Sequence, residues 1–147
     1  MRHRYASRLT RANPGFLLAK ALQRWNELLY AGFCEEGFAY VRPSFGSVLI
    51  PLFEEDGLRL GELARRARLS KQTMTTMVRL VQKAGLVTLR GDPEDSRATL
   101  VYLSDEAKRF RPVAGKILGA LERRAKDVGG GERLSQVCDW LKRFAQL

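Results

Sequence analysis

The amino-acid sequence predicts a mostly α-helical protein with one small β-hairpin, and three observations lead to this fold class. Apolar residues recur at spacings of three and four through most of the chain, which is the period of an amphipathic helix. Residues that favour helix starts and helix ends divide the chain into segments. Only two short stretches, 86–90 and 98–103, are rich in strand-forming residues, and the loop between them contains Asp, Pro and Gly.

The length and composition limit the classes of protein to consider. With 147 residues, 45% of them hydrophobic, the chain suffices for one packed core, so we expect a single domain over 1–147. No apolar run approaches the roughly 18 residues that cross a bilayer, so we expect a soluble protein with no membrane partner. The formal net charge of +10 attracts polyanions, with nucleic acid ahead of anionic membrane.

The N-terminal segment and the two cysteines bear on the cellular location. Residues 1–16 contain four arginines and no acid, and a solvated basic arm explains this composition better than an organelle transit peptide. Cys34 and Cys138 lack the spacing of a disulfide framework, which fits a reducing cytoplasm. We expect both thiols to be buried packing residues, with oxidant sensing as the alternative.

The first part of the chain predicts three helices. An Asn-Pro pair supplies the cap and the first residue of a helix over about 13–32. After a break at glycine, a second helix is expected over about 44–54, in which Pro51 removes one backbone hydrogen bond. A short third helix over 60–67 carries small residues where a partner helix can cross closely.

A fourth helix follows after a tight turn. Ser70 is a good N-cap for a helix over 71–84, and Gly85 suits a left-handed C-terminal residue. Only about three residues separate this helix from the one over 60–67, which is the helix-turn-helix layout.

The C-terminal part predicts two further helices after the hairpin. Ser104, followed by two acids, caps a helix from 105 to about 127 that is disturbed near Pro112. Three glycines at 129–131 then form a joint before a final helix over about 132–146.

The helix over 71–84 has two distinct faces at 100° per residue. Met74, Val78 and Val81 lie on the apolar face, whereas the opposite face has no acid and is rich in threonine. Short polar side chains can bond base edges or phosphates in a major groove, whereas a merely solvated face tends to use Glu and Lys. An ordinary surface helix is the alternative. We expect DNA contacts from Lys71, Gln72, Thr73, Thr75, Thr76 and Arg79.

The hairpin tip places three acids around one arginine in a basic protein. Asp92 begins a turn, and Asp95 can bond local amides, so both shape the tip, which we expect to be long. We also expect the carboxylates to hold the Arg97 guanidinium ready for a narrow minor groove, whose negative potential favours arginine. A solvated turn is the alternative, and the spacing excludes an EF-hand calcium loop.

Residues 58–105 resemble the winged helix-turn-helix core of MarR-family transcription regulators. The wing of that family carries Asp-Pro-x-Asp-x-Arg, which here is the segment from Asp92 to Arg97. One departure is Arg68, which stands where the family commonly has glycine in the turn between the two helices. A left-handed backbone there would cost about 1–2 kcal/mol, or the turn differs slightly.

The resemblance implies an architecture and a mode of action. It implies a winged helix-turn-helix lobe over 44–103, with N- and C-terminal dimerisation helices over 13–43 and 104–147. It also implies a bacterial homodimer in which each subunit places 71–84 in the major groove and Arg97 in the flanking minor groove.

The predicted function is therefore sequence-specific binding of double-stranded DNA by a homodimeric transcriptional regulator. Repression in response to a small molecule is one mode of action that fits, and the sequence leaves activation open as the other. The resemblance implies an effector pocket between the dimer helices and the DNA-binding lobe. Candidate lining residues, which otherwise form core, are Trp25, Phe33, Phe38, Tyr40 and Phe45. The alternative is a winged-helix protein that binds DNA non-specifically or serves as a protein interaction module.

An enzyme is not expected. His3 is the only histidine and lies in the basic tail, where a solvated residue is favoured over a general base. The chain has no metal-ligand spacing, phosphate-binding glycine loop or serine elbow, so we expect no cofactor and no metal.

Overall fold

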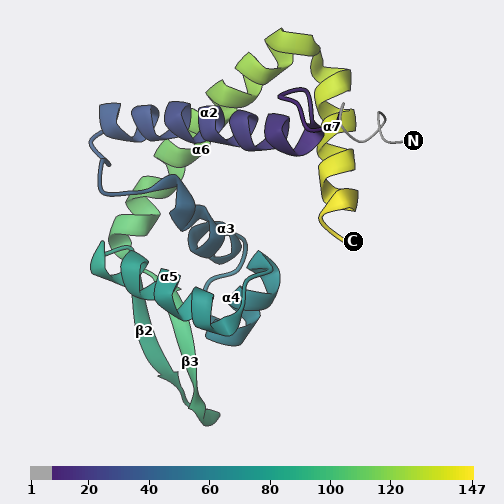
Figure 1. Ribbon diagram of the computed structural model, residues 1–147. Coiled ribbons are helices and arrows are strands. Elements are labelled where there is room, and N and C mark those ends of the chain that lie inside the picture. The colour runs from purple at the N-terminus through teal and green to yellow at the C-terminus, as the bar shows by residue number, and fades with distance from the viewer. Residues whose placement is uncertain (1–7) are drawn as a thin grey trace.

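The computed structural model describes residues 8–147 and has the predicted fold class, mostly helical with a small β-hairpin (Figure 1). The predictions for His3 and for the arginines at 2 and 4 lie outside this range. Among the described residues, no helix has the length and apolar character to cross a membrane. The helices are α2 (Pro14–Glu35), η1 (Pro43–Phe45), α3 (Gly46–Glu54), α4 (Leu60–Ala67), α5 (Lys71–Lys83), α6 (Asp105–Gly129) and α7 (Gly131–Phe144).

The elements are arranged with the long helices at one end and the hairpin at the other. Figure 1 shows α2 and α6 crossing above α3, α4 and α5, while the hairpin projects from the opposite side of these three helices. At the crossing, a Cβ added to Gly32 of α2 would lie 2.8 Å from Cγ2 of Ile117 on α6, so only glycine allows this approach. The two long helices are thus closely packed where they cross.

Three helices, α2, α5 and α6, begin with the side-chain caps that the sequence predicts. Asn13 Oδ1 accepts hydrogen bonds from the amides of Gly15 (2.8 Å) and Phe16 (3.3 Å). Ser70 Oγ accepts from the Thr73 amide at 3.1 Å, and Ser104 Oγ accepts from the Ala107 amide at 3.2 Å. These bonds satisfy amides that have no partner within the helix, and each cap stabilises its helix by about 1 kcal/mol.

Two helical predictions need correction. The helix expected over 44–54 begins as the 3₁₀ turn η1 and becomes α-helical only from Gly46. The helix expected to be disturbed near Pro112 runs unbroken as α6 to Gly129, because a proline replaces a single backbone donor while the neighbouring turns keep theirs. Gly130, with φ of 93°, then makes the corner into α7.

The sheet differs from the predicted two-stranded hairpin. It has three antiparallel strands, β1 (Leu58–Arg59), β2 (Val87–Asp92) and β3 (Asp95–Leu103), in the order β1-β3-β2. The two-residue β1 pairs with Val101 and Leu100 of β3 and was missed because so short a strand has no periodicity of its own. The expected long tip is also wrong, because β2 and β3 extend until only two residues separate them.

The core fixes which way the helices of the lobe face. Buried side chains come from α3, α4, α5 and the sheet, and fully buried examples are Val48, Leu52, Leu63, Met74, Val78, Val81 and Val101. Burial of each such side chain contributes about 1.5–3 kcal/mol. Because α5 places Met74, Val78 and Val81 in this core, its opposite face is held toward solvent.

The turn between α4 and α5 keeps the left-handed geometry despite its arginine. Arg68 has φ of 54° and ψ of 41°, and among the described residues it is the one non-glycine with positive φ. The Leu69 amide donates to the Ala64 carbonyl at 3.0 Å, which closes the end of α4. Arg68 Nη1 also donates to the carbonyl of Ala145, so the turn is linked to the C-terminal end of α7.

Candidate nucleic-acid interface

The solvent-facing side of α5 carries all six residues predicted to contact DNA. Gln72, Thr73, Thr76 and Arg79 are exposed, as is Lys71 at the first turn, while Thr75 is half-buried. The first turn of α5 contains no acid. The one side-chain cap at this helix end is the bond from the Thr73 amide to Ser70 Oγ, so the other backbone amides of the first turn are left without a side-chain cap. The start of α5 therefore presents the Lys71 ammonium charge and the partial positive charge of its backbone amides to the same region.

Two threonine hydroxyls of α5 are already used as hydrogen-bond donors. Thr75 Oγ1 donates to the Lys71 carbonyl at 2.8 Å, and Thr76 Oγ1 donates to the Gln72 carbonyl at 3.2 Å. Each hydroxyl keeps acceptor capacity, and each threonine also keeps its methyl group for apolar contact. This face thus offers acceptors and methyl groups, while lysine, arginine and the Gln72 amide supply donors.

The wing tip is built by its carboxylates, although not in the way expected for Arg97. Asp92 Oδ1 accepts the Glu94 amide at 2.9 Å, and Asp95 Oδ1 accepts the Arg97 amide at 3.0 Å, so both residues shape the turn as predicted. The guanidinium of Arg97 makes no ion pair with these acids among residues 8–147. Asp92 instead pairs with Arg59 at 2.7 Å, which corrects the expectation that the acids hold the arginine side chain.

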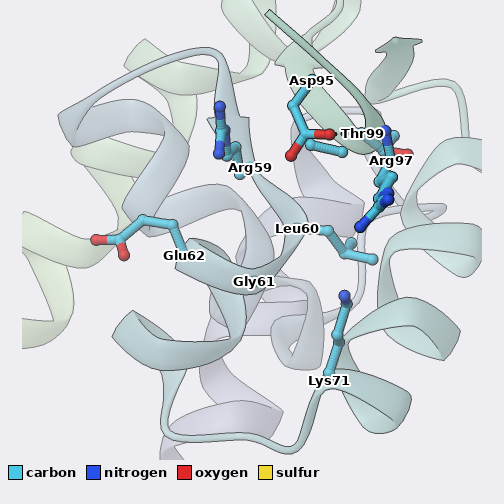
Figure 2. A pocket seen from close by; sticks show the side chains of 9 residues that line it. Arg59, Leu60, Gly61, Glu62, Lys71, Asp95, Arg97 and Thr99 are labelled. Atoms are coloured by element: carbon cyan, nitrogen blue, oxygen red, sulfur yellow. Dashed lines mark hydrogen bonds between the residues drawn. The ribbon is translucent and has the colours of Figure 1, made fainter. Parts of the chain in front are cut away.

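A groove separates the wing from the N-terminal ends of α4 and α5. It has a volume of about 430 Å³. Arg59, Leu60, Glu62 and Lys71 border it on the side of the helices, and Asp95, Arg97 and Thr99 border it on the side of the wing. Figure 2 shows the Lys71 and Arg97 side chains pointing into the same space from α5 and β3, while the Glu62 carboxylate points away from it. The predicted helix contact and the predicted wing contact therefore border one groove.

The acids near this groove are occupied by other partners. Glu62 accepts bonds from Arg65 (2.6 and 2.9 Å) and Arg66 (2.9 Å), and these bonds lower the pKa of its carboxyl to about 2. Asp95 bonds the local backbone. Arg59, Lys71 and Arg97 thus outnumber the one acid, Asp95, whose carboxylate lines the groove, and this excess of positive charge suits an anionic strand.

Sequence reasoning missed Arg59, which belongs to β1 and borders this groove. The residue lies 33 positions before its partner Asp92, so no local spacing connects the two. A signal was available in the Leu-Arg pair directly before the 60–67 helix, where an extended residue can place a long cationic side chain beside the sheet.

A second hollow lies between α2, α3 and α6 and contains part of the predicted effector pocket. Its volume is about 430 Å³, and Trp25 and Phe33, two of the residues predicted for that pocket, line it. Phe38, Tyr40 and Phe45 do not. Phe38 is buried against Phe110 with ring centroids 5.1 Å apart, Phe45 is 7% exposed, and the Tyr40 hydroxyl donates to Glu106, so these three serve packing and a surface contact instead.

Two cations border this apolar hollow. Arg42 lies over the Tyr30 ring with 5.1 Å from Cζ to the centroid, and Arg111 lies over Phe53 at 5.5 Å. The hollow therefore combines aromatic and aliphatic walls with positive charge at its border.

Both cysteines are exposed, so the expectation of buried packing is wrong. Cys34 lies near the end of α2 on the side away from the core, and Cys138 lies on α7. Among residues 8–147, no three His, Cys, Asp or Glu side chains are grouped closely enough to hold a metal ion.

Large apolar side chains remain exposed on the terminal helices. No residue of α7 is buried, and Trp140 (46% exposed) stacks on Phe144 (55% exposed) with ring centroids 5.1 Å apart. On α2, Leu17 and Leu22 are 53% and 60% exposed. Exposed apolar side chains grouped on helices in this way, on a charged protein, indicate faces that another surface covers.

Comparisons with known proteins agree with this geometry. The MarR family model matches residues 52–98, the region from α3 through the wing. A curated relative, the organic hydroperoxide resistance transcriptional regulator of Bacillus subtilis (strain 168), is 26% identical over 84 residues. The match takes in 54% of this chain and spans a little over half, 57%, of that relative's length.

Solved structures match over nearly the whole chain. The PcaV transcriptional regulator of Streptomyces coelicolor, solved with its natural ligand, has a TM-score of 0.79 at 22% identity, covering 94% of this chain and 96% of that one. A probable transcriptional regulator from Pseudomonas aeruginosa has a TM-score of 0.76 at 25% identity, covering 88% and 95%. The repressor CouR, bound to a 23-mer DNA duplex, has a TM-score of 0.77 at 21% identity, covering 90% and 92%.

Proposed function

We propose that the chain is a homodimeric transcriptional regulator of the MarR family, which binds double-stranded DNA at specific sequences. The observation that carries the proposal is the placement of an acid-free, threonine-rich helix face and a wing arginine on either side of one groove (Figure 2). A recognition helix and a wing that border the same groove can enter the major and the adjacent minor groove together.

In this proposal α5 is the recognition helix. Gln72 is placed to pair with adenine, and the threonines offer methyl groups to thymine and acceptors to amino groups of bases. Lys71 and Arg79, at the start and middle of the exposed face, contact phosphates and set the register of the helix on the duplex.

The wing supplies the minor-groove contact in the same proposal. Arg97 is exposed on β3 near the tip, and Asp92 and Asp95 hold the backbone of that tip by their bonds to local amides. A guanidinium on a fixed backbone suits a narrow minor groove because the negative potential there is enhanced.

The exposed apolar residues of α2 and α7 favour a second copy of this chain as the covering surface. In a two-fold dimer these faces are buried against their own equivalents, which explains why α7 has no buried residue in the single chain. We assign residues 44–103 to the DNA-binding lobe, and residues 13–43 and 104–147 to dimerisation.

The hollow between α2, α3 and α6 is the place for an effector that releases the repressor from DNA. Trp25 and Phe33 provide flat apolar walls, and Arg42 and Arg111 provide positive charge, so a planar anionic molecule fits the site best. The hollow lies between the dimerisation helices and the DNA-binding lobe, where a bound molecule can change their relative position.

Selection from a random duplex library tests the proposal directly. We expect enrichment of a pseudo-palindromic motif with half-sites about one helical turn apart, which a two-fold symmetric reader requires. Gln72→Ala should relax base preference at one position per half-site by about 1–3 kcal/mol, and Arg97→Ala should weaken binding through the flanking minor groove. If binding is tight but no motif is enriched, the chain binds DNA non-specifically and the proposal fails.

A further inference from the structure

One ion pair joins the wing tip to the rest of the lobe. Arg59 Nη2 lies 2.7 Å from Asp92 Oδ2, and the Asp92 side chain is 7% exposed, compared with 51% for the Arg59 side chain. Arg59 belongs to β1 and Asp92 ends β2, and β3 lies between these two strands in the sheet. The arginine side chain therefore reaches past the middle strand to hold the carboxylate beyond it.

The same carboxylate closes the turn at the tip. One Asp92 oxygen accepts the Glu94 amide, and the other oxygen pairs with Arg59. Below the tip the strand register steps from Gly91 opposite Thr99 to Asp92 opposite Asp95, so residues 96–98 of β3 have no partner in β2. Arg97 lies in the middle of this unmatched segment and gains no support from the β2 ladder.

The position of Arg97 thus depends on how the tip is held. The Asp95 bond to the Arg97 amide joins this segment to the turn, and the Asp92 carboxylate joins the turn to Arg59. Arg59 precedes α4 directly, and α4 is packed against α5 in the core of the lobe. A chain of contacts therefore runs from the buried helices through Arg59 to the wing arginine.

We propose that Arg59 is a positioning residue for the wing, which sets the distance between Arg97 and the N-terminal end of α5 through Asp92. This inference rests on the proposed function and adds to it a residue outside both the recognition helix and the hairpin. One DNA backbone strand separates a major groove from the adjacent minor groove, so a protein that reads both must let that strand pass between its helix and its wing. The groove bordered by Lys71 and Arg97 is where the strand passes, and Arg59 sets its width.

Asp92→Asn distinguishes positioning from simple charge attraction. If Arg59 acted only as a phosphate contact, removal of the neighbouring negative charge would leave DNA affinity unchanged or raise it. If Arg59 acts through Asp92, the same substitution lowers affinity although the protein becomes more positive. The two models therefore predict opposite signs for one measurement.

The experiment measures the affinity of the full chain for its selected operator at several salt concentrations. We expect Arg59→Gln and Asp92→Asn each to lower affinity about tenfold, the size of a lost charge-assisted contact. The double variant should lose no more than either single variant, because both remove the same link. Arg59→Lys, which keeps a cation beside Asp92, should retain most of the affinity.

Hydrogen exchange of the DNA-free protein supplies a measurement independent of binding. Amides of residues 91–99 should exchange faster in Arg59→Gln, while the thermal midpoint of the whole protein stays within a few degrees, as for other surface changes. Arg90→Gln is the matched control, because Arg90 lies on β2 over the Tyr102 ring and, among residues 8–147, forms no ion pair with Asp92. Like Arg59→Gln, this substitution removes one positive charge close to the wing, but it should leave hydrogen exchange at the tip unchanged.

Two results would overturn this inference. One is an Asp92→Asn variant that binds its operator as tightly as the unaltered protein or more tightly, and the other is unchanged exchange at the tip in Arg59→Gln. Both differ from failure of the proposed function, in which the unaltered protein itself enriches no motif from the duplex library.

Discussion

Thr76 shows how a single side chain on α5 can read a base. Its Oγ1 donates to the Gln72 carbonyl oxygen at a distance of 3.2 Å. The methyl group therefore remains free to face DNA, and the hydroxyl oxygen can still accept a hydrogen bond. A thymine methyl is the natural partner of a threonine methyl in the major groove.

Thr76→Val and Thr76→Ser form a matched pair that tests this reading. We expect Thr76→Val to keep the base preference of its half-site position, since valine retains the methyl. Thr76→Ser should relax that preference by about 1 kcal/mol, because serine lacks the methyl. Duplex selection with each variant measures the effect, and the opposite order would assign base reading to the hydroxyl oxygen.

Arg68 occupies a left-handed position that usually favours glycine. An L-residue there costs about 1–2 kcal/mol, while its guanidinium gains a hydrogen bond to the Ala145 carbonyl worth about 1 kcal/mol. Arg68→Ala keeps the backbone cost and loses the bond, whereas Arg68→Gly loses the bond but also removes the backbone cost. We expect the glycine variant to be more stable than the alanine variant by about 1 kcal/mol in urea unfolding at fixed protein concentration. Equal stabilities would show that the turn relaxes in the variants.

At the scale of elements, a network of charges links α3 to α4. Glu62 pairs with Arg65 and Arg66, and Arg66 also pairs with Glu55 at the end of α3. Because the bonds from the two arginines lower the pKa of Glu62 from 4.5 to about 2, the ionised form is favoured in the folded state. The stability that this carboxylate contributes is therefore complete above the unfolded pKa near 4.5 and is lost as pH falls toward 2.

This pKa shift predicts a pH dependence that Glu62→Gln lacks. Between pH 5 and about pH 2 the midpoint of unfolding should fall more steeply for the unaltered protein than for the variant, since the variant has no proton to bind at this position. Other carboxyl groups titrate in the same range, so the difference between the two curves is the informative quantity. Parallel curves would mean that the pairing contributes nothing measurable, as is common for exposed ion pairs.

The elements that depend on local chemistry could be predicted from the sequence. Helix starts at 14, 71 and 105 were identified because Asn13, Ser70 and Ser104 bond amides two or three residues ahead. The buried face of α5 followed from its period, and the turn-forming roles of Asp92 and Asp95 followed from short-range bonds.

The elements that depend on distant partners could not be predicted in this way. The strand β1 exists only because it pairs with residues 100 and 101, and the partner of Asp92 lies on that strand. Similarly, nothing in the spacing of the aromatic residues distinguished Phe38, which packs against Phe110, from Phe33, which touches Phe110 and also lines the hollow. Such pairings arise from tertiary contacts that a single sequence does not display.

For the whole molecule, the proposed dimer makes a direct prediction about α7. Trp140→Glu places a charge in the exposed apolar face and should shift the protein toward monomers, which sedimentation velocity measures. Ser135→Glu adds the same charge on the opposite face of α7 and should leave the dimer intact. Because two half-sites must be held together, we expect the Trp140 variant to lose operator affinity at least tenfold, about the contribution of a second linked site. A Trp140→Glu variant that remains dimeric would place the interface elsewhere.

The contact between Gly32 and Ile117 has a consequence for such a dimer. With no side chain on α2 at this point, Ile117 of α6 lies directly against the α2 backbone, and this close packing resists sliding of one helix along the other. Two-fold symmetry repeats any tilt in the other subunit, so the spacing of the paired reading helices changes by twice the displacement of either one. A molecule bound beside the crossing would therefore change the spacing of the two α5 helices by more than it moves either one. A small shift in each subunit could then make that spacing differ from the helical repeat of DNA.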